Sequence, residues 1–169
     1  MIQKIEDLYV KSDPFIKEFD IFCNVNGLIN KVKADHVCVK CSTSEIYENT
    51  RKHFEFDSRF MYQSLIPGRR IAFIGLSKSL YTAVGEIKYL ELSDQKKDNS
   101  QGDRIDHIEI VPVTLTYEEL VSFLKEKGNE VKEIIRPHHT THDVYMKSGF
   151  IVRLSRELLV ETIKRDGMV

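Results

Sequence analysis

The chain has 169 residues, a length that suits one domain or two half-sized modules sharing a core. Its 25 basic and 26 acidic residues are mixed along the sequence and leave a net charge of −1. This balance lacks the basic stripe of a nucleic-acid-binding protein, so we expect no nucleic-acid partner. Long apolar runs and a cationic leader are missing, which predicts a cytoplasmic protein without a membrane partner.

Three cysteines, an odd number, do not predict a disulfide framework in a chain of this length. Cys38 and Cys41 have the spacing of a zinc or redox pair, but no second pair accompanies them. On a strand their sulfur atoms would point to opposite faces. We therefore interpret both as buried thiols.

The first 33 residues predict a helical extension that carries no chemistry. Apolar residues recur at helical spacing up to residue 12 and again after residue 14. Asp13 followed by Pro14 is typical of an N-cap and a first helical position, and Gly27 is typical of a helix end. The pattern therefore predicts two successive helices within residues 1–33.

Residues 34–93 predict a first module of one strand, one helix and three strands. The expected elements are a strand at 34–41, a helix opening at 42–45, and strands at 59–66, 70–76 and 86–93. Pro67 and Gly68 predict the hairpin between the second and third strands. If Leu90 and Leu92 pack against a helix, Glu91 points to the other face of the last strand.

Residues 94–104 are polar and rich in turn formers, which predicts a solvated linker. Residues 105–169 then repeat the plan of the first module and add a final helix. The expected elements are a strand through residue 107, a helix at 116–128, extended pieces at 131–136 and up to 146, a strand at 150–155, and a last helix capped by Ser155.

The first strand of each module carries an Asp-His pair. His36 and His107 lie 71 positions apart, each at the start of a β-branched run. Alternation along a strand places Cys38 and Lys40 on the face of His36, and Glu109 on the face of His107. A face with histidines and carboxylates beside an apolar face predicts a sheet with helices behind it and a chemical site in front.

This order, with a histidine on the first strand of each copy, resembles the vicinal oxygen chelate superfamily, which includes glyoxalase I, the bleomycin- and fosfomycin-resistance proteins and the extradiol dioxygenases. Within that superfamily the chain is most similar to the YecM branch. The residues that carry the resemblance are 35–41, 68–71, 91–92 and 106–111. The resemblance implies an α+β fold in which two βαβββ modules form a cupped mixed sheet, with the N-terminal helices as an extension.

The resemblance also implies one divalent metal ion, held by His36 and Glu91 of the first module and His107 of the second. Arg153 stands where the superfamily often has a glutamate, and an arginine cannot bind a metal because it keeps its proton. Three alternatives stay open: three protein ligands, a neighbouring substitute, or a lost metal. The ligand types do not choose among Zn, Mn, Fe and Ni.

Four further residues are candidates for the site. Glu109 shares a face with His107 and is either a catalytic base or the substitute ligand. Lys40 and Arg153 are expected to bind an anionic substrate, or else to neutralise the nearby glutamates. His142 ends a histidine-rich tract, residues 138–142, and is a candidate substrate-binding or acid/base residue, although such tracts are often solvated.

We therefore expect a metal-dependent enzyme of the glyoxalase-like type, an isomerase, epimerase, lyase or dioxygenase, acting on a small anionic metabolite rich in oxygen. The alternative is a non-catalytic protein of the same fold that binds or sequesters a small molecule without metal. Both modules lie in one chain, so a monomer suffices to complete the site, and a homodimer is the other expectation.

Overall fold

The computed structural model describes residues 2, 5–66, 68–135 and 140–165. The helices are α1 (Ile5–Val25), α2 (Ser44–Asp57), α3 (Tyr117–Glu126) and α4 (Leu159–Arg165). The strands are β1 (Val32–Lys40), β2 (Ser58–Ile66), β3 (Arg69–Thr82), β4 (Gly85–Ser93), β5 (Arg104–Pro112), β6 (Val131–Ile135), β7 (Thr140–Tyr145) and β8 (Ile151–Leu154). Among the described residues, none of the helices combines the length and apolar character that crossing a bilayer requires.

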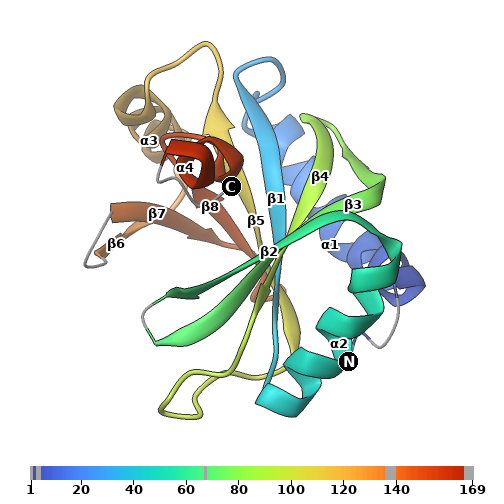
Figure 1. The fold of residues 1–169 in the computed structure, drawn as a ribbon. Helices are drawn as coiled ribbons and strands as arrows, with labels where there is room; N and C mark the ends of the chain where they lie inside the picture. The colour runs from blue at the N-terminus through green and yellow to red at the C-terminus, as the bar shows by residue number, and fades with distance from the viewer. Residues whose placement is uncertain (1, 3–4, 67, 136–139, 166–169) are drawn as a thin grey trace.

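The strands form one eight-stranded sheet in the order β2-β3-β4-β1-β5-β8-β7-β6. Its two halves repeat the same pattern outward from the central antiparallel pair β1–β5. In each half the last strand of the module lies parallel to the first, β4 beside β1 and β8 beside β5, and the other pairings are antiparallel. The predicted α+β fold of two βαβββ modules is thus confirmed (Figure 1).

The hydrophobic core lies between one face of the sheet and the helices α1, α2 and α3 (Figure 1). Leu90 and Leu92 of β4 are fully buried in this core, so Glu91 between them points to the opposite face, as alternation predicts. On β8, Val152 and Leu154 face the core in the same way and leave Arg153 on the opposite face. We call that opposite face, which carries His36, Glu91, His107, Glu109 and Arg153, the cup face.

The N-terminal extension differs from the prediction because it contains one helix rather than two. Helix α1 continues for 21 residues with Pro14 inside it. A proline in a helix interior removes one backbone hydrogen bond. Leu8 before the proline and Phe19 after it are both fully buried in the same core, and this packing on one face favours a single helix over a break.

The second module confirms one predicted helix cap and corrects another. Thr116 caps α3, and its capping box with Glu119 is complete. The final helix, however, begins at Leu159 and not directly after Ser155. The backbone N–H of Leu159 donates to the Oδ2 atom of Asp35 at 2.9 Å, and the backbone oxygen of Leu158 accepts from the N–H groups of Glu161 and Thr162.

The segment between β4 and β5 is polar but not entirely solvated. The side chain of Gln101 is buried, and its amide donates hydrogen bonds to the backbone oxygens of Cys41, Ser93 and Asp94. Its Oε1 atom accepts a hydrogen bond from Arg69 at 2.6 Å. One buried amide thus joins this segment to the ends of β1 and β4, which composition alone did not predict.

Candidate metal centre

The two Asp-His pairs lie at irregularities of the central β1–β5 pairing. Asp35 and His36 of β1 together lie opposite the single residue Glu109, because the register shifts between Ala34 and Val37. A second shift leaves Asp106 of β5 without a partner residue on β1. Such bulges add one residue to a strand and redirect side chains. They allow neighbouring aspartate and histidine side chains to meet, although regular alternation would separate them.

Each aspartate orients the histidine that follows it. The Nδ1 atom of His36 lies 2.9 Å from Oδ2 of Asp35, and Nδ1 of His107 lies 2.9 Å from Oδ2 of Asp106. All four side chains are buried. A carboxylate on Nδ1 places the proton there and leaves Nε2 as the free donor nitrogen, which is the usual arrangement around metal-binding histidines.

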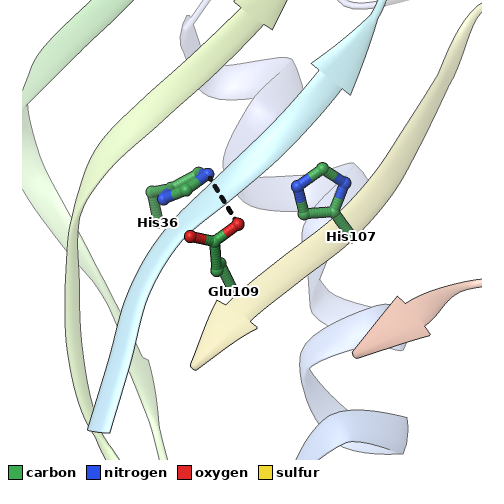
Figure 2. Close-up of side chains that lie close together, drawn as sticks. All are labelled: His36, His107 and Glu109. Atoms are coloured by element: carbon green, nitrogen blue, oxygen red, sulfur yellow. Dashed lines mark ion pairs between the residues drawn. The ribbon is translucent and has the colours of Figure 1, made fainter. Parts of the chain in front are cut away.

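The Nε2 atom of His36 faces two carboxylates. It lies 3.8 Å from Oε2 of Glu91. It also lies 3.9 Å from Oε2 of Glu109, the ion pair drawn in Figure 2. These distances allow charge interaction but no hydrogen bond. Within the described part of the chain, this fully buried nitrogen has no hydrogen-bond partner. A buried polar atom without a partner is costly, so the arrangement is suited to a cation between the three groups.

The ring of His107 lies on the other side of Glu109, with its centroid 5.9 Å from that of His36 (Figure 2). Donor atoms of His36, His107 and Glu109 all lie within 4.8 Å of one another. The Nε2 atom of His107, however, is 3.0 Å from Nη1 of Arg153 and accepts a hydrogen bond from it. A cation that used this nitrogen would have to displace the guanidinium group.

The repeat places Glu91 and Arg153 at equivalent positions of the two modules. Glu91 pairs with Cys38 two residues after His36, and Arg153 pairs with Glu109 two residues after His107. The thiol of Cys38 donates to Oε1 of Glu91 at 3.2 Å. Arg153 donates to both carboxylate oxygens of the buried Asp143, at 2.8 and 2.9 Å. The second module thus holds a paired cation where the first holds a carboxylate.

The surroundings move the pKa values of the four central groups in different directions. Burial alone would lower the pKa of His36, but the charge of Glu109 and the hydrogen bond of Asp35 raise it to about 9. Burial and the charge of Arg153 lower the pKa of His107 to about 4. Burial would raise the pKa of Glu91, yet the two histidines hold it below its usual value, whereas burial keeps the pKa of Glu109 raised.

Aromatic side chains border the site on the side of the first module. The ring of Phe73 meets His36 edge-on at 6.4 Å and stacks on Tyr89 at 5.0 Å. Phe60 packs against both, at 6.1 and 5.9 Å, above Gly75. A Cβ atom at Gly75 would lie 2.7 Å from the Phe60 ring, so any other residue there would require this ring to move. These rings keep water from one side of His36.

Two of the predicted substrate-binding residues have other contacts in the structure. Lys40 forms an ion pair with Asp106 at 2.6 Å. His142 does not join the cluster, because its Nδ1 atom lies 2.7 Å from the hydroxyl of Tyr117 on helix α3, on the face opposite to Asp143. The other tract histidines, 138 and 139, lie outside the described residues.

The sequence interpretation assigned no role to Asp35, Asp106, Asp143 or Cys38. The repeated Asp-His dipeptide was a signal for Asp35 and Asp106. Strict alternation along a strand, however, places neighbouring residues on opposite faces. The bulges that bring each aspartate to its histidine leave no recognisable pattern in the sequence. Asp143 is recognisable only from the contact between β7 and β8.

A family model described as YecM protein matches residues 4–155. The chain belongs to the YecM family. This agrees with the predicted resemblance, and helix α4 lies beyond the matched residues of this YecM-family chain. The chain matches no curated protein.

One solved structure, described as "Structural Genomics, Protein EC4020", is 22% identical to this YecM-family chain, covers 96% of it and 92% of its own length, and has a TM-score of 0.70. A xylose isomerase-like TIM barrel/4-hydroxyphenylpyruvate dioxygenase fusion protein is 12% identical over 80% of this chain and 29% of its own, with a TM-score of 0.44. FosX, a fosfomycin resistance protein from Listeria monocytogenes solved with Mn(II) and a sulfate ion, is 16% identical over 78% of this chain and 94% of its own length, with a TM-score of 0.29. The likeness in fold rests on the first.

Proposed function

We propose that this protein is a metal-dependent enzyme of the glyoxalase-like type that acts on a small anionic metabolite rich in oxygen. The observation that carries the proposal is the buried Nε2 atom of His36, which lacks a hydrogen-bond partner among the described residues and faces Glu91 and Glu109. Imidazole and carboxylate donors together are the ligands that Zn, Mn, Fe and Ni accept in proteins.

The distances from the Nε2 atom of His36 fit a ligand set with either glutamate, and the donor atoms of His107 lie within 4.8 Å of those of His36 and Glu109. Two atoms bound to one ion at about 2.1 Å lie roughly 3–3.5 Å apart. The separations of 3.8 and 3.9 Å from His36 therefore require only a small contraction. His36, Glu91 and His107 would hold the ion, and Asp35 and Asp106 would fix the two rings. A bound divalent ion supplies Lewis-acid stabilisation of negative charge on a substrate oxygen.

Glu91 and Glu109 are suited to different roles because their pKa values diverge. The pKa of Glu91 is lowered, so it stays ionised and is suited to bind a cation. Burial raises the pKa of Glu109, so its carboxylate accepts a proton more readily. We assign to Glu109 the role of general base, which removes a proton from the substrate carbon next to a carbonyl group and returns it in an isomerisation or epimerisation.

The anionic charge of the substrate is inferred from Arg153. Its Nε and Nη2 atoms bind Asp143, while Nη1 points to His107 on the cup face. If an ion takes Nε2 of His107, Nη1 loses its acceptor and becomes available to a substrate carboxylate or phosphate. Lys40 contributes less, because Asp106 already neutralises it.

The same Arg153 contact favours a second candidate function, a metal-free protein that binds a small molecule. The guanidinium already donates to Nε2 of His107 at 3.0 Å and so occupies a nitrogen that a metal would need. In this alternative Arg153 is the permanent cation of the second module, and an anionic ligand pairs with the protonated His36, whose pKa is raised to about 9.

Two glutamine substitutions, Glu91→Gln and Glu109→Gln, distinguish the two candidate functions. Each variant is supplied with Mn, Fe, Ni or Zn and assayed for exchange of substrate C–H for deuterium by ¹H NMR, with a panel of small 2-oxo and 2-hydroxy carboxylates. If the protein is a metal-dependent enzyme, Glu91→Gln loses the ion, whereas Glu109→Gln keeps the ion but no longer catalyses the deuterium exchange. Glu126→Gln, an exposed residue of α3, is the matched control. Exchange or ligand binding that persists after chelation supports the metal-free alternative.

A further inference from the structure

A polar cavity of about 430 Å³ lies at one end of the sheet, and none of its lining residues belongs to the cup face. It is bordered by the adjoining ends of β2 and β3, the first residue of α2 and the loop that follows β4 (Figure 1). Four of its ten lining residues are basic, and one, Asp94, is acidic. The basic residues are Arg69, Arg70, Lys96 and Lys97. The volume falls within the range of small-molecule sites, and the lining favours an anion.

The carboxylate of Asp94 is already used within the protein. Its Oδ2 atom accepts a hydrogen bond from Nε of Arg70 at 2.8 Å. Its Oδ1 atom accepts from the hydroxyl of Ser44 at 3.0 Å and from the backbone N–H of Gln95 at 2.7 Å. Arg70 also forms an ion pair with Glu48. Asp94 and Glu48 therefore neutralise Arg70, and both oxygens of Asp94 have their donors.

The other three basic residues differ in their partners. Lys96 has an acidic neighbour, because the hydrogen bonds of Ser100 and, to a smaller extent, the charge of Lys96 lower the pKa of Asp98. Neither Arg69 nor Lys97 forms an ion pair with a carboxylate in the described part of the chain. Two positive charges without an acidic partner therefore line this cavity.

A neutral, buried side chain holds the guanidinium of Arg69 in place. Its Nη1 atom donates to Oε1 of Gln101 at 2.6 Å. Gln101 is itself fixed, because its amide donates to the backbone oxygens of Ser93 and Asp94. This contact orients Arg69 without neutralising it, and Nε and Nη2 stay available to a ligand. Arg69 is also only partly exposed, so solvent screens its charge less than that of a surface arginine.

The ammonium group of Lys97 reaches the cavity from the loop after β4. Gly68, which precedes Arg69, has a positive φ of 78°. A Cβ atom at Gly68 would lie 3.0 Å from Cε and from Nζ of Lys97, so the end of the lysine side chain lies against this glycine. The two cations without acidic partners thus converge from different segments of the chain on neighbouring positions.

We propose that this cavity binds a small phosphate monoester, with its phosphate group between Arg69 and Lys97. Such a group carries a charge of about −1.5 to −2 at pH 7 and three acceptor oxygens, so it can pair with both cations at once, whereas a carboxylate balances only one. Arginine is suited to donate two hydrogen bonds to a phosphate. The cavity is larger than a phosphate group, which leaves room for a polar organic part beside Gln95 and Asn99.

This proposal is independent of the proposed metal-dependent reaction. None of the candidate residues for the cup-face site lines the cavity. The failure of either proposal would therefore leave the other intact. The experiment separates them by the location of the ligand, because an anion that binds near Arg153 lies on the cup face and not at this end of the sheet.

The test is titration of isotope-labelled protein with glycerol 3-phosphate in phosphate-free buffer at pH 7.5, followed by two-dimensional NMR of backbone amides. The expected result is saturable shifts at Gly68, Lys97 and Asn99. Arg69→Gln and Lys97→Gln should each weaken binding about tenfold, because each removes one charge-assisted contact. The matched controls are Arg59→Gln on β2 and Lys88→Gln on β4, two exposed residues outside the cavity lining, which should bind as the parent does.

Two further probes test the ligand class. Glycerate has a similar carbon skeleton but one negative charge, so it should bind in this cavity at least tenfold more weakly. Inorganic phosphate lacks the organic part and should also bind several-fold more weakly. The proposal is overturned if glycerol 3-phosphate causes no saturable shifts, if its shifts lie only at the cup face, if both glutamine variants bind as the parent does, or if either probe binds equally well.

Discussion

Asp35 and Leu159 are 124 positions apart in the sequence, and a hydrogen bond of 2.9 Å joins the backbone N–H of Leu159 to Oδ2 of Asp35. The same oxygen atom binds Nδ1 of His36. One carboxylate oxygen therefore both orients a proposed metal ligand and accepts a hydrogen bond from the first backbone N–H of the seven-residue helix α4. The position of the C-terminal helix and the orientation of His36 are coupled through a single group.

Removing this one N–H tests the coupling. Leu159→Pro deletes the donor at the first helical position, where proline is tolerated, whereas Leu159→Ala keeps it. We expect the proline variant to bind a divalent ion several-fold more weakly than the alanine variant, because Asp35 then orients His36 less firmly. Competition with a chromophoric chelator measures both affinities. Equal affinities would show that α4 and the metal centre are independent.

The carboxylate of Asp35 should affect metal affinity more strongly than its hydrogen bond to helix α4 does. Asp35→Asn replaces the carboxylate that holds Nδ1 of His36, and loss of such a partner typically lowers metal affinity by roughly 10–100-fold. Asp103→Asn alters an aspartate that accepts hydrogen bonds from Ser42 and contacts neither histidine in the described part of the chain, so it is the control. Metal affinity within twofold of the parent in Asp35→Asn would contradict the assigned role of the Asp-His pair.

Asp106 should contribute to stability as well as to the site. Burial alone would raise its pKa, but His107 and Lys40 hold that pKa well below its usual value. Asp106→Asn leaves Lys40 without its partner and should lower the free energy of unfolding by about 3 kcal/mol at pH 7. Adding Lys40→Met should restore much of the loss. Urea unfolding of the single and double variants measures this.

The contribution of Asp106 to stability also depends on pH. A depressed pKa in the folded state stabilises the protein above the unfolded-state pKa, which is about 3.9 for aspartate, and this stabilisation disappears as the pH falls toward the folded-state value. The difference between the parent and Asp106→Asn should therefore shrink below about pH 4. A difference that stays constant down to pH 2 would show that ionisation of Asp106 is not its source.

Arg153 should compete with the metal. The paired substitution Arg153→Met and Asp143→Asn removes both buried charges together, so neither is left without a partner. The change frees Nε2 of His107 and removes a repulsive charge, so divalent-ion affinity should rise about tenfold. A fall in affinity, measured by the same chelator competition, would place Arg153 among the groups that support the ion.

Packing behind the site should dominate overall stability. Leu90 on β4 is fully buried between the sheet and the helices, and Leu90→Ala should cost roughly 2–5 kcal/mol. Leu65 on β2 is 72% exposed, and Leu65→Ala should change stability by less than about 0.5 kcal/mol. Similar costs in urea unfolding would contradict the assignment of the helix-facing side as the core.

The order of strands and helices in the two modules could be predicted from the sequence. Buried and more exposed side chains alternate along strands such as β4, and Thr116 is a recognisable N-cap of α3. The sequence also predicted that Glu91 and Arg153 would share a face with the histidines. It failed where a distant contact decides the outcome. The pair Asp13-Pro14 predicts a helix start, yet packing of Leu8 and Phe19 keeps α1 continuous. The first backbone N–H of α4 donates to Asp35, a contact that no local pattern encodes.

The metal centre is tested by the metal content, measured by plasma mass spectrometry, of untagged protein purified without chelator, beside His36→Ala and Leu65→Ala. We expect about one divalent ion per chain in the parent and in Leu65→Ala, and loss of this ion in folded His36→Ala. A parent that holds no ion and takes up none of Mn, Fe, Ni or Zn would contradict the metal centre and favour the metal-free binding protein.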